Sequence, residues 1–516
     1  MTPAADEFRL PEPGLERYSW FWDPLHCPRP VPALAGDTWQ AFTATMGNDA
    51  VLVNGYVYLG MGAPRRVAPA AIDPPPALAF GEMWRSHSLP RVRAALAAIH
   101  GRDYESMDAP ALAALLPGSL REAAAAFAYT MQPMFATMGP MQALLAFCAK
   151  HFGAEGDLLA TTLLQGLEND SAATGSGLGE LAAAAAARPA VAAALRAGCF
   201  EGLVSLDGGP EFVALLAVYL DEYGSGNHTW AEIHKPSWRE EPAIPLRMIA
   251  AFLASEGGPA ANQERARAQR AEARSAAGAR LDPEAREQFR GLLEAMHDYV
   301  PVVEDRARWQ LAAAGAVRSA ALALGARLAT AGALAERDDI FYLHTDESAR
   351  LAAGELPEAR AVVAERRITL DRAACLVPPA SLGAPLPAGF NQDPMIARMF
   401  GFGAARPVTG NVVHGIGASR GIFRGRARVV LDLDDADRVE PGDVLVCPFT
   451  APPWTPLFAI AGAVVTDVGG VLSHSAIAAR EYAVPCVCGT GTATRAIPDG
   501  AVVTVDGAAG TVVIEG

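Results

Sequence analysis

The stretch TDVGGVLSHSAIAARE (residues 466–481) lies between the apolar runs GAVV and VPCVCG. The order of strand, Gly-Gly turn, helix and strand is typical of a compact α/β module. His474 stands where the strand has ended and the helix begins. Because the first turn of a helix has unpaired N–H groups and a positive dipole end, a negative charge is stabilised there. The stretch therefore predicts an α/β fold with a histidine at a helix N-terminus.

The residues before His474 suit a histidine that carries a phosphoryl group. Gly469 and Gly470 have no Cβ, so the backbone can approach a bound group closely. Ser473 or a neighbour can cap the helix. The alternative is that His474 only caps the helix.

Three further side chains complete this predicted site. Thr466 and Ser475 add hydroxyls that can face a phosphoryl group, and Arg480 could neutralise its charge. No second histidine, cysteine or acid lies at ligand spacing, so we predict no metal here. No order of nucleophile, histidine and acid is evident either.

The segment 466–494 resembles the phosphohistidine, or mobile, domain of the phosphoenolpyruvate-utilising enzymes. The family motif is matched in order by Thr466, Gly469, Gly470, Ser473, His474, Ala476, Ala479, Arg480, Pro485 and Val487. The segments 415–430 and 442–458 and the C-terminal DGAVVTVDGAAGTVVIEG resemble the rest of that domain, with Arg420 where a proline is common. The resemblance implies a swivelling phosphohistidine domain over 411–516 and names His474 as the phosphorylated residue.

The residues before this module read differently. Residues 1 to about 70 favour irregular structure with a short strand or hairpin, since VLVNGYVYLG alternates like a strand around an Asn-Gly turn, and 78–375 are dominated by helical patterns. We expect a helix or hairpin over 261–298 and another helix over about 305–333. The Pro/Gly-rich stretch from 376 to 410 predicts a flexible linker. The predicted fold class is multidomain: a mainly α-helical acceptor-binding domain (1–375) and then a small α/β domain.

The helical part is similar, more weakly, to the antibiotic-binding middle domain of rifampicin phosphotransferase and to a phenylphosphate synthase subunit. The matching segments are 22–34, 221–242 and 324–347. The resemblance implies a small hydroxylated acceptor, phenolic or aromatic.

Composition limits the partners and the location. The 516 residues carry a formal net charge of −15, which argues against a nucleic-acid or anionic-membrane partner. The seven scattered cysteines favour reduced thiols, and the acidic, Pro-rich N-terminus is unlike a signal peptide. We therefore expect a cytoplasmic protein. Residues 123–149 are uncharged, but prolines, glycines and glutamines interrupt them, which favours a buried helical pair over a membrane span.

The phosphoryl donor is expected on another subunit. Lys150 and Lys235 are the only lysines, and neither follows a Gly-rich phosphate loop. The chain ends with the mobile domain, so the resemblance implies a split enzyme. A separate ATP-grasp subunit would bind ATP and Mg²⁺ and convert ATP to AMP and phosphate, and this chain would bind neither tightly.

The acceptor site is predicted from residue type. Transfer to a hydroxyl calls for a general base, for which His228 and His234 are the candidates. Tyr223, Trp230 and Glu232 lie near them in sequence. Other possible pocket residues are His26 and the methionines at helical spacing, Met131, Met134, Met138 and Met141.

The sequence thus predicts a phosphotransferase component that carries a phosphoryl group on His474 and passes it to an organic hydroxyl. Two alternatives stay open. The chain could be a non-catalytic phosphocarrier or regulatory protein, or a relic whose His474 is never phosphorylated.

Overall fold

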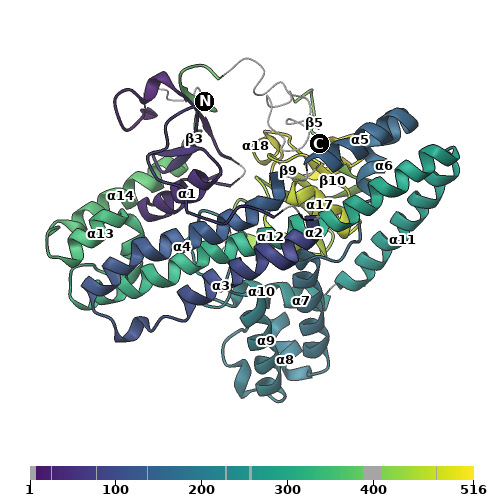
Figure 1. Cartoon of the computed structure of the whole chain (residues 1–516). Coiled ribbons are helices and arrows are strands. Elements are labelled where there is room, and N and C mark those ends of the chain that lie inside the picture. Colours follow the sequence, from purple (N-terminus) through teal and green to yellow (C-terminus); the bar gives the residue numbers. More distant parts are fainter. Residues whose placement is uncertain are drawn as a thin grey trace. The chain divides into compact units, whose positions relative to one another are not determined.

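A computed structural model describes residues 7–24, 26–76, 78, 80–135, 138–226, 229–254, 258–386, 408–471 and 473–515. Figure 1 shows the elements in chain order. Contacts within the chain divide it into two compact units. Unit 1 comprises Met1–Phe135, Ser225–Ser237 and Trp309–Phe390, and unit 2 comprises Ala136–Gly224, Trp238–Arg308 and Asn391–Gly516.

Unit 1 contains a four-stranded antiparallel sheet in the order β2-β3-β1-β4. Its strands are β1 (Ser19–Trp22), β2 (Asp49–Val53), β3 (Tyr56–Met61) and β4 (Ser381–Gly383). Asn54 and Gly55 connect β2 to β3 with positive φ angles of 52° and 77°, which a tight hairpin turn requires. The hairpin predicted at VLVNGYVYLG is confirmed.

The helices of unit 1 lie in the predicted helical region 78–375, except α1, which forms within the residues before 70 that were expected to be irregular; its buried face packs into the core. They are α1 (Ala33–Thr45), α2 (Phe80–Met83), α3 (Leu89–His100), α4 (Ala109–Phe135), α13 (Thr345–Ala352) and α14 (Ala359–Ala374). Trp20, Val51, Tyr58 and Ala373 belong to one buried cluster. Helix and sheet of this unit therefore share a hydrophobic core.

The first part of the predicted linker is ordered. Residues 381–383 form strand β4, which pairs with β1, and the hydroxyl of Tyr58 donates to the carbonyl of Pro379 at 2.9 Å. A free linker over all of 376–410 is therefore wrong at its start, because these backbone groups are paired within unit 1. Residues 387–407 of that prediction lie outside the described residues.

Unit 2 begins with helices. They are α5 (Met138–Phe152), α6 (Gly156–Thr162), α7 (Asp170–Ala186), α8 (Pro189–Arg196), α9 (Gly209–Tyr223), α10 (Ala243–Ala254) and α11 (Gly258–Ala279). The next helix, α12 (Pro283–Thr330), supplies its residues up to Arg308 to unit 2 and the rest to unit 1. The hairpin expected over 261–298 is present, but the break expected before 305 is not. Helix α12 continues through Pro301, which removes one backbone donor without ending the helix.

The remainder of unit 2 is an eight-stranded sheet in the order β5-β12-β11-β7-β8-β9-β10-β6. Its strands are β5 (Val412–His414), β6 (Ile416–Ser419), β7 (Ile422–Val429), β8 (Val444–Cys447), β9 (Ala463–Thr466), β10 (Cys486–Cys488), β11 (Val502–Asp506) and β12 (Thr511–Ile514). Strands β7, β8, β9 and β10 are parallel, and the other pairings are antiparallel. Valines from β8, β9 and β11 fill its core.

Three short helices complete this α/β region: α16 (Thr455–Phe458), α17 (His474–Glu481) and α18 (Ala493–Ala496). The helix predicted after the Gly-Gly turn is therefore confirmed as α17. So is the coarse fold class, a mostly helical N-terminal region followed by an α/β domain.

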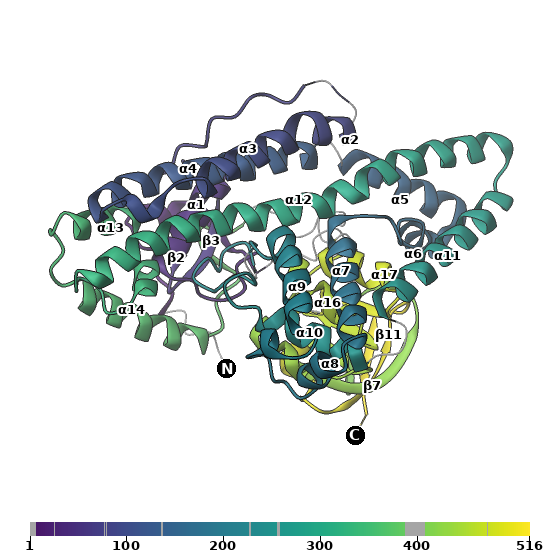
Figure 2. The ribbon, with the colours of Figure 1, turned by 90° about the horizontal axis from the view of Figure 1, so that it is seen from below.

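The domain boundaries differ from the predicted ones. The helical part expected as one domain over 1–375 is divided, because its residues 136–224 and 238–308 fall in the same unit as the α/β region. The contacts responsible join α7 to α16 and α17, α11 to α17, and α6 to β6. Figure 2 shows α7 and α10 beside α16. The α/β region is therefore packed against helices in this structure.

Within the described residues, two helices are long and apolar enough to cross a membrane by length and composition alone, and α7 with α8 would make a third candidate if this bent pair counts as one span. The two helices are α4 over Ala109–Gln132, with 50% of the tested window buried inside the protein, and α12, with 72% buried. A helix face buried by other protein segments is not available to lipid. The uncharged stretch 123–149 is divided between α4 and α5.

Candidate functional site

The loop between β9 and α17 brings His474 to the first position of the helix. Ser473 is the N-cap residue. Its Oγ accepts a hydrogen bond from the backbone N–H of Ala476 at 3.4 Å, and its hydroxyl donates one to the carbonyl of Gly470 at 2.8 Å. Such a cap typically stabilises a helix by about 1 kcal/mol. Ser473 therefore fixes where the helix starts and where the imidazole is held.

The first glycine of the pair is required by backbone geometry. Gly469 has a φ of 120°, which side-chain-bearing residues rarely adopt, and an added Cβ would lie 2.8 Å from the Oγ of Ser473. Gly489 packs closely against the same loop: a Cβ added at Gly489 would lie 2.7 Å from the carbonyl oxygen of Gly469.

Both ring nitrogens of His474 have partners. Nδ1 lies 3.0 Å from Oε2 of Glu304, a residue of α12, and Nε2 lies 3.2 Å from Oγ1 of Thr455, the first residue of α16. The side chains of His474 and Glu304 are 6% and 3% exposed. Because an ionised carboxylate only accepts hydrogen bonds, Glu304 favours the tautomer with the proton on Nδ1. The lone pair is then on Nε2, where the hydroxyl of Thr455 can donate to it.

Sequence reasoning missed Glu304 and Thr455. Thr455 lies in the segment 442–458, which resembles the mobile domain. That resemblance was a signal in the sequence that its hydroxyl could lie near His474. Glu304 follows the apolar run YVPVV, and an acid after such a run is a weak sign of a buried partner.

Thr466 and Ser475 have other partners than the imidazole. Thr466 is buried and donates to the carbonyl of Val468 at 2.8 Å, which shapes the loop. The Oγ of Ser475 accepts a hydrogen bond from the hydroxyl of Thr450 at 2.8 Å. Both hydroxyls therefore hold the turn together in this structure.

Arg480 is buried and its contacts are with the backbone. Its Nη1 donates to the carbonyl of Ala418 at 3.0 Å and its Nη2 to that of Val471 at 2.9 Å. Burial lowers the pKa of its guanidinium to about 10. The contacts seen here differ from the predicted contact with phosphate: Arg480 ties α17 to β6 and to the loop.

The C-terminal end of α17 is buried in unit 2. Burial, opposed by the charge of Arg480 and reinforced by that of Glu304, raises the pKa of the Glu481 carboxyl to about 8. The next residue, Tyr482, is 3% exposed, and its ring lies against the position of Gly175 in α7. These two side chains and the His474–Glu304 pair join the α/β region to the helices.

Several predicted acceptor residues do gather in unit 1. Trp230 donates through Nε1 to Oε1 of Gln310 at 3.0 Å, and Glu232 pairs with Arg29 at 3.1 Å. His234 Nδ1 is buried without a hydrogen-bond partner among the described residues. Burial lowers the pKa of its imidazole to about 4, so it is neutral at pH 7 and a weaker base than an exposed histidine.

His26 joins this group, and Trp39 is a member that sequence reasoning missed. The His26 ring lies 5.2 Å from that of Trp230 and 5.1 Å from that of Trp39. Its Nδ1 lies 3.0 Å from the carboxylate of Asp23. Nε1 of Trp39 is buried without a partner in the described part of the chain. We call His26, Trp39, Trp230, Glu232 and His234 the aromatic cluster.

The remaining acceptor candidates lie elsewhere or cannot be placed. Tyr223 belongs to unit 2, where its ring lies under the guanidinium of Arg308 at 4.7 Å. His228 lies outside the described residues, and so do the side chains of Met134 and Met138. Met131 and Met141 are buried, which is typical of core methionines.

Two known family models match parts of the chain that contain Glu304 and His474. Residues 129–304 match the model described as the rifampicin phosphotransferase fourth domain, and 439–510 match that of the PEP-utilising enzyme mobile domain. The first match ends at Glu304, and the second contains His474.

Similar curated proteins include a chondramide synthase of Chondromyces crocatus, 30% identical over 457 residues, or 84% of this chain and 12% of that protein. A rifampicin phosphotransferase of Streptomyces sviceus is 31% identical over 320 residues, or 60% of this chain and 35% of that protein. A phosphoenolpyruvate synthase of Aeropyrum pernix is 48% identical over 102 residues, or 20% and 12%. The chain thus spans about a third or less of the length of these relatives.

Proposed function

We propose that this chain is a phosphotransferase component, because it matches the models of the rifampicin phosphotransferase fourth domain and the PEP-utilising enzyme mobile domain and is similar to rifampicin phosphotransferases. His474 receives a phosphoryl group and passes it to a hydroxyl of a small organic acceptor. The observation that carries this proposal is the 3.0 Å contact between Nδ1 of His474 and the carboxylate of Glu304.

The pair prepares His474 for nucleophilic attack. With the Nδ1 proton held by Glu304, the lone pair of Nε2 attacks phosphorus. The N–P bond forms as the bond from phosphorus to the donor's oxygen breaks, and the donor leaves with both electrons. The ring then carries a positive charge, which the buried carboxylate stabilises. The hydroxyl of Thr455 and the N-terminal end of α17 lie where the phosphoryl oxygens need donors.

The second step returns the ring to its starting state. The acceptor oxygen attacks phosphorus, the N–P bond breaks, and its electrons return to Nε2. The acceptor's proton needs a base, and His234 is the candidate, since its buried Nδ1 has no hydrogen-bond partner among the described residues. Its lowered pKa means that it would accept the proton only as the acceptor oxygen forms its bond to phosphorus. The rings of the aromatic cluster favour a phenolic or aromatic acceptor.

The donor in this proposal is ATP bound with Mg²⁺ on an ATP-grasp subunit, which forms AMP and phosphate. The 516 residues contain no Gly-rich phosphate loop followed by a lysine, which supports a donor site outside them. The mobile domain moves between donor and acceptor on the predicted linker. The proposed location is the cytoplasm, where ATP is supplied.

The experiment is phosphorylation of the full chain in two parallel arms. One arm uses ATP, Mg²⁺ and the ATP-grasp protein encoded beside it, and the other uses phosphoramidate, whose phosphorus Nε2 attacks with loss of ammonia. We expect one acid-labile phosphoryl group by intact mass, located on Nε2 of His474 by phosphorus NMR.

Two variants define the outcome. His474→Ala should lose the label, whereas His414→Ala, a change at another histidine of the same domain, should keep it. Absence of label on His474 in both arms, or equal labelling of the His474→Ala variant, would overturn the proposal. Label that forms but is never discharged to hydroxylated aromatic probes would instead favour the phosphocarrier alternative.

A further inference from the structure

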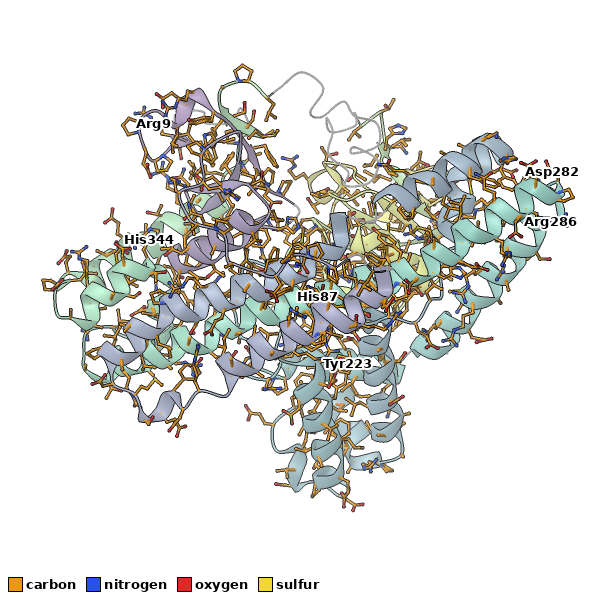
Figure 3. All side chains as sticks on the ribbon, in the orientation of Figure 1. Arg9, His87, Tyr223, Asp282, Arg286 and His344 are labelled. Atoms are coloured by element: carbon orange, nitrogen blue, oxygen red, sulfur yellow. The ribbon has the colours of Figure 1, made fainter. Side chains whose placement is uncertain are left out.

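Helices α11 and α12 line an open cavity of about 770 Å³ within unit 2. Arg267, Arg270 and Arg274 line it from α11 at spacings of three and four residues, which places them on one helix face. Arg286 and Arg290 line it from α12 in the same way. Figure 3 labels Arg286 beside the turn that joins the two helices. We call this cavity the arginine groove.

The charge of the lining is strongly one-sided. Five arginines line the groove, and Glu287 is the single acidic residue among the lining residues. The whole chain has a net charge of −15, so the lining of this groove has the opposite sign to the chain as a whole. A long solvated helix normally alternates its charges around its surface.

Two of the five arginines have carboxylate partners. Arg267 lies 3.2 Å from Glu168, and Arg290 pairs with Glu287 and Glu294. These contacts are between exposed side chains, where an ion pair contributes little.

The other three have no carboxylate partner within the described part of the chain. Arg270 donates to the carbonyl of Gln165 at 3.0 Å, and Arg286 donates to those of Gly278 and Leu281, both at 2.9 Å. Arg274 is exposed and makes no hydrogen bond or ion pair with the described residues. Burial lowers the pKa of the Arg270 guanidinium; the charge of Glu481 opposes this shift, and the charges of Arg267 and Arg274 add to it. The neighbouring arginines of α11 therefore repel one another, and a bound anion would reduce this repulsion.

Apolar groups line the rest of the groove. Phe289 and Leu293 are buried core residues of α12, and Ala271 and Pro283 add aliphatic surface. A volume of this size is within the range of small-molecule sites, which combine an apolar lining with a few charged groups.

We propose that the arginine groove binds a phosphorylated small organic molecule. Guanidinium groups hold phosphate oxygens through paired hydrogen bonds, and several arginines at helical spacing suit more than one anionic oxygen. The apolar lining takes the organic part. The site is distinct from His474 and does not depend on phosphoryl transfer.

Titration calorimetry on the full chain tests this, with pyrophosphate, AMP and phenyl phosphate as probes and sulfate as a simple anion. We expect phenyl phosphate or AMP to bind more tightly than sulfate, with affinity that falls as salt rises. Arg274→Glu should weaken binding by about tenfold or more, since one charged contact becomes repulsive. Arg265→Glu makes the same charge change on α11 outside the lining and should weaken it by less than about twofold.

The outcomes separate this site from the proposed function. His474→Ala should leave groove binding unchanged, so a failure of phosphorylation has no effect on this test. If pyrophosphate bound as tightly as phenyl phosphate and AMP, the claim that the apolar lining contacts the organic part of the ligand would be wrong. Equal loss in Arg265→Glu and Arg274→Glu, or no phosphate probe binding more tightly than sulfate, would overturn it.

Discussion

The ring of Tyr482, just after α17, occupies the space that a side chain at Gly175 of α7 would need. An added Cβ at Gly175 would collide with the Tyr482 hydroxyl. Helix α7 contains the sequence TGSGLG at 174–179, although each glycine in a helix costs about 1 kcal/mol relative to alanine. The close approach of tyrosine rings explains why glycine is needed there, since Tyr219 lies against Gly177 in the same way.

Gly175→Ala should therefore loosen the packing of α17 against α7. The alanine favours the helix but forces Tyr482 away, and overpacking of this kind typically costs about 1–3 kcal/mol. Hydrogen exchange should become faster at the amides of 475–482. Gly177→Ala is the control: its Cβ meets Tyr219 of α9, so exchange in α17 should stay unchanged. The same increase in both variants would contradict a specific Tyr482–Gly175 contact.

Glu304→Gln should slow phosphorylation of His474. The amide has nearly the same size but no charge to stabilise the imidazolium, and hydrogen bonds to charged groups are worth roughly 1.5–3 kcal/mol. This corresponds to a rate loss of about tenfold to a hundredfold, measured as labelling by phosphoramidate over time. Glu294→Gln, an exposed position on the same helix, should leave the rate unchanged. A normal rate in Glu304→Gln would remove the carboxylate from the mechanism.

The α/β region could be predicted from the sequence because its signals are local. Gly469, Gly470, Ser473 and His474 lie within six residues, and the φ of Gly469 and the N-cap role of Ser473 depend only on this short segment. The Asn54-Gly55 turn was predictable for the same reason, since asparagine and glycine are the residues that most readily adopt the positive φ angles that a two-residue hairpin turn requires.

The partners of His474 could not be predicted in this way. Glu304 is 170 residues away in sequence, and one acid in a helix carries no local sign of what it will meet. The orientation of the Arg480 side chain could not be predicted either, because it depends on the tertiary fold. In the structure its guanidinium donates to backbone carbonyls of β6 and of the loop before α17. Pairing of 381–383 with β1 depends on another long-range contact.

Gly469→Ala should destabilise the loop and reduce phosphorylation together. Alanine is strained at a φ of 120° and would collide with the Oγ of Ser473, a combined cost of about 1–3 kcal/mol. Gly500→Ala is the matched control, because Gly500 has a φ of 83° but nothing within 4 Å of an added Cβ. The melting temperature should fall in both variants, whereas phosphorylation of His474 should fall in Gly469→Ala alone. Equal loss of labelling would show that general destabilisation, not the capping geometry, is responsible.

The stability of unit 2 should depend on pH through Glu481. Its carboxyl has a folded-state pKa of about 8 against an ordinary value of 4.5, with burial as the main cause. Between these values the unfolded chain has released the proton and the folded protein keeps it. The free energy of unfolding contributed by this group therefore falls as pH rises from about 4.5 to about 8, and then stays level.

Glu481→Gln removes that dependence, because glutamine resembles the protonated acid at every pH. The variant should have nearly the wild-type melting temperature at pH 5 and a higher one at pH 8, by a free energy on the order of 4 kcal/mol. Glu272→Gln, an exposed position on α11, should change neither value. The Arg480 charge and the backbone amides of Gly166 and Leu167 act in the opposite direction to burial. If they outweighed burial, Glu481→Gln would be less stable than the wild type at pH 8, so the sign of the difference decides which effect dominates.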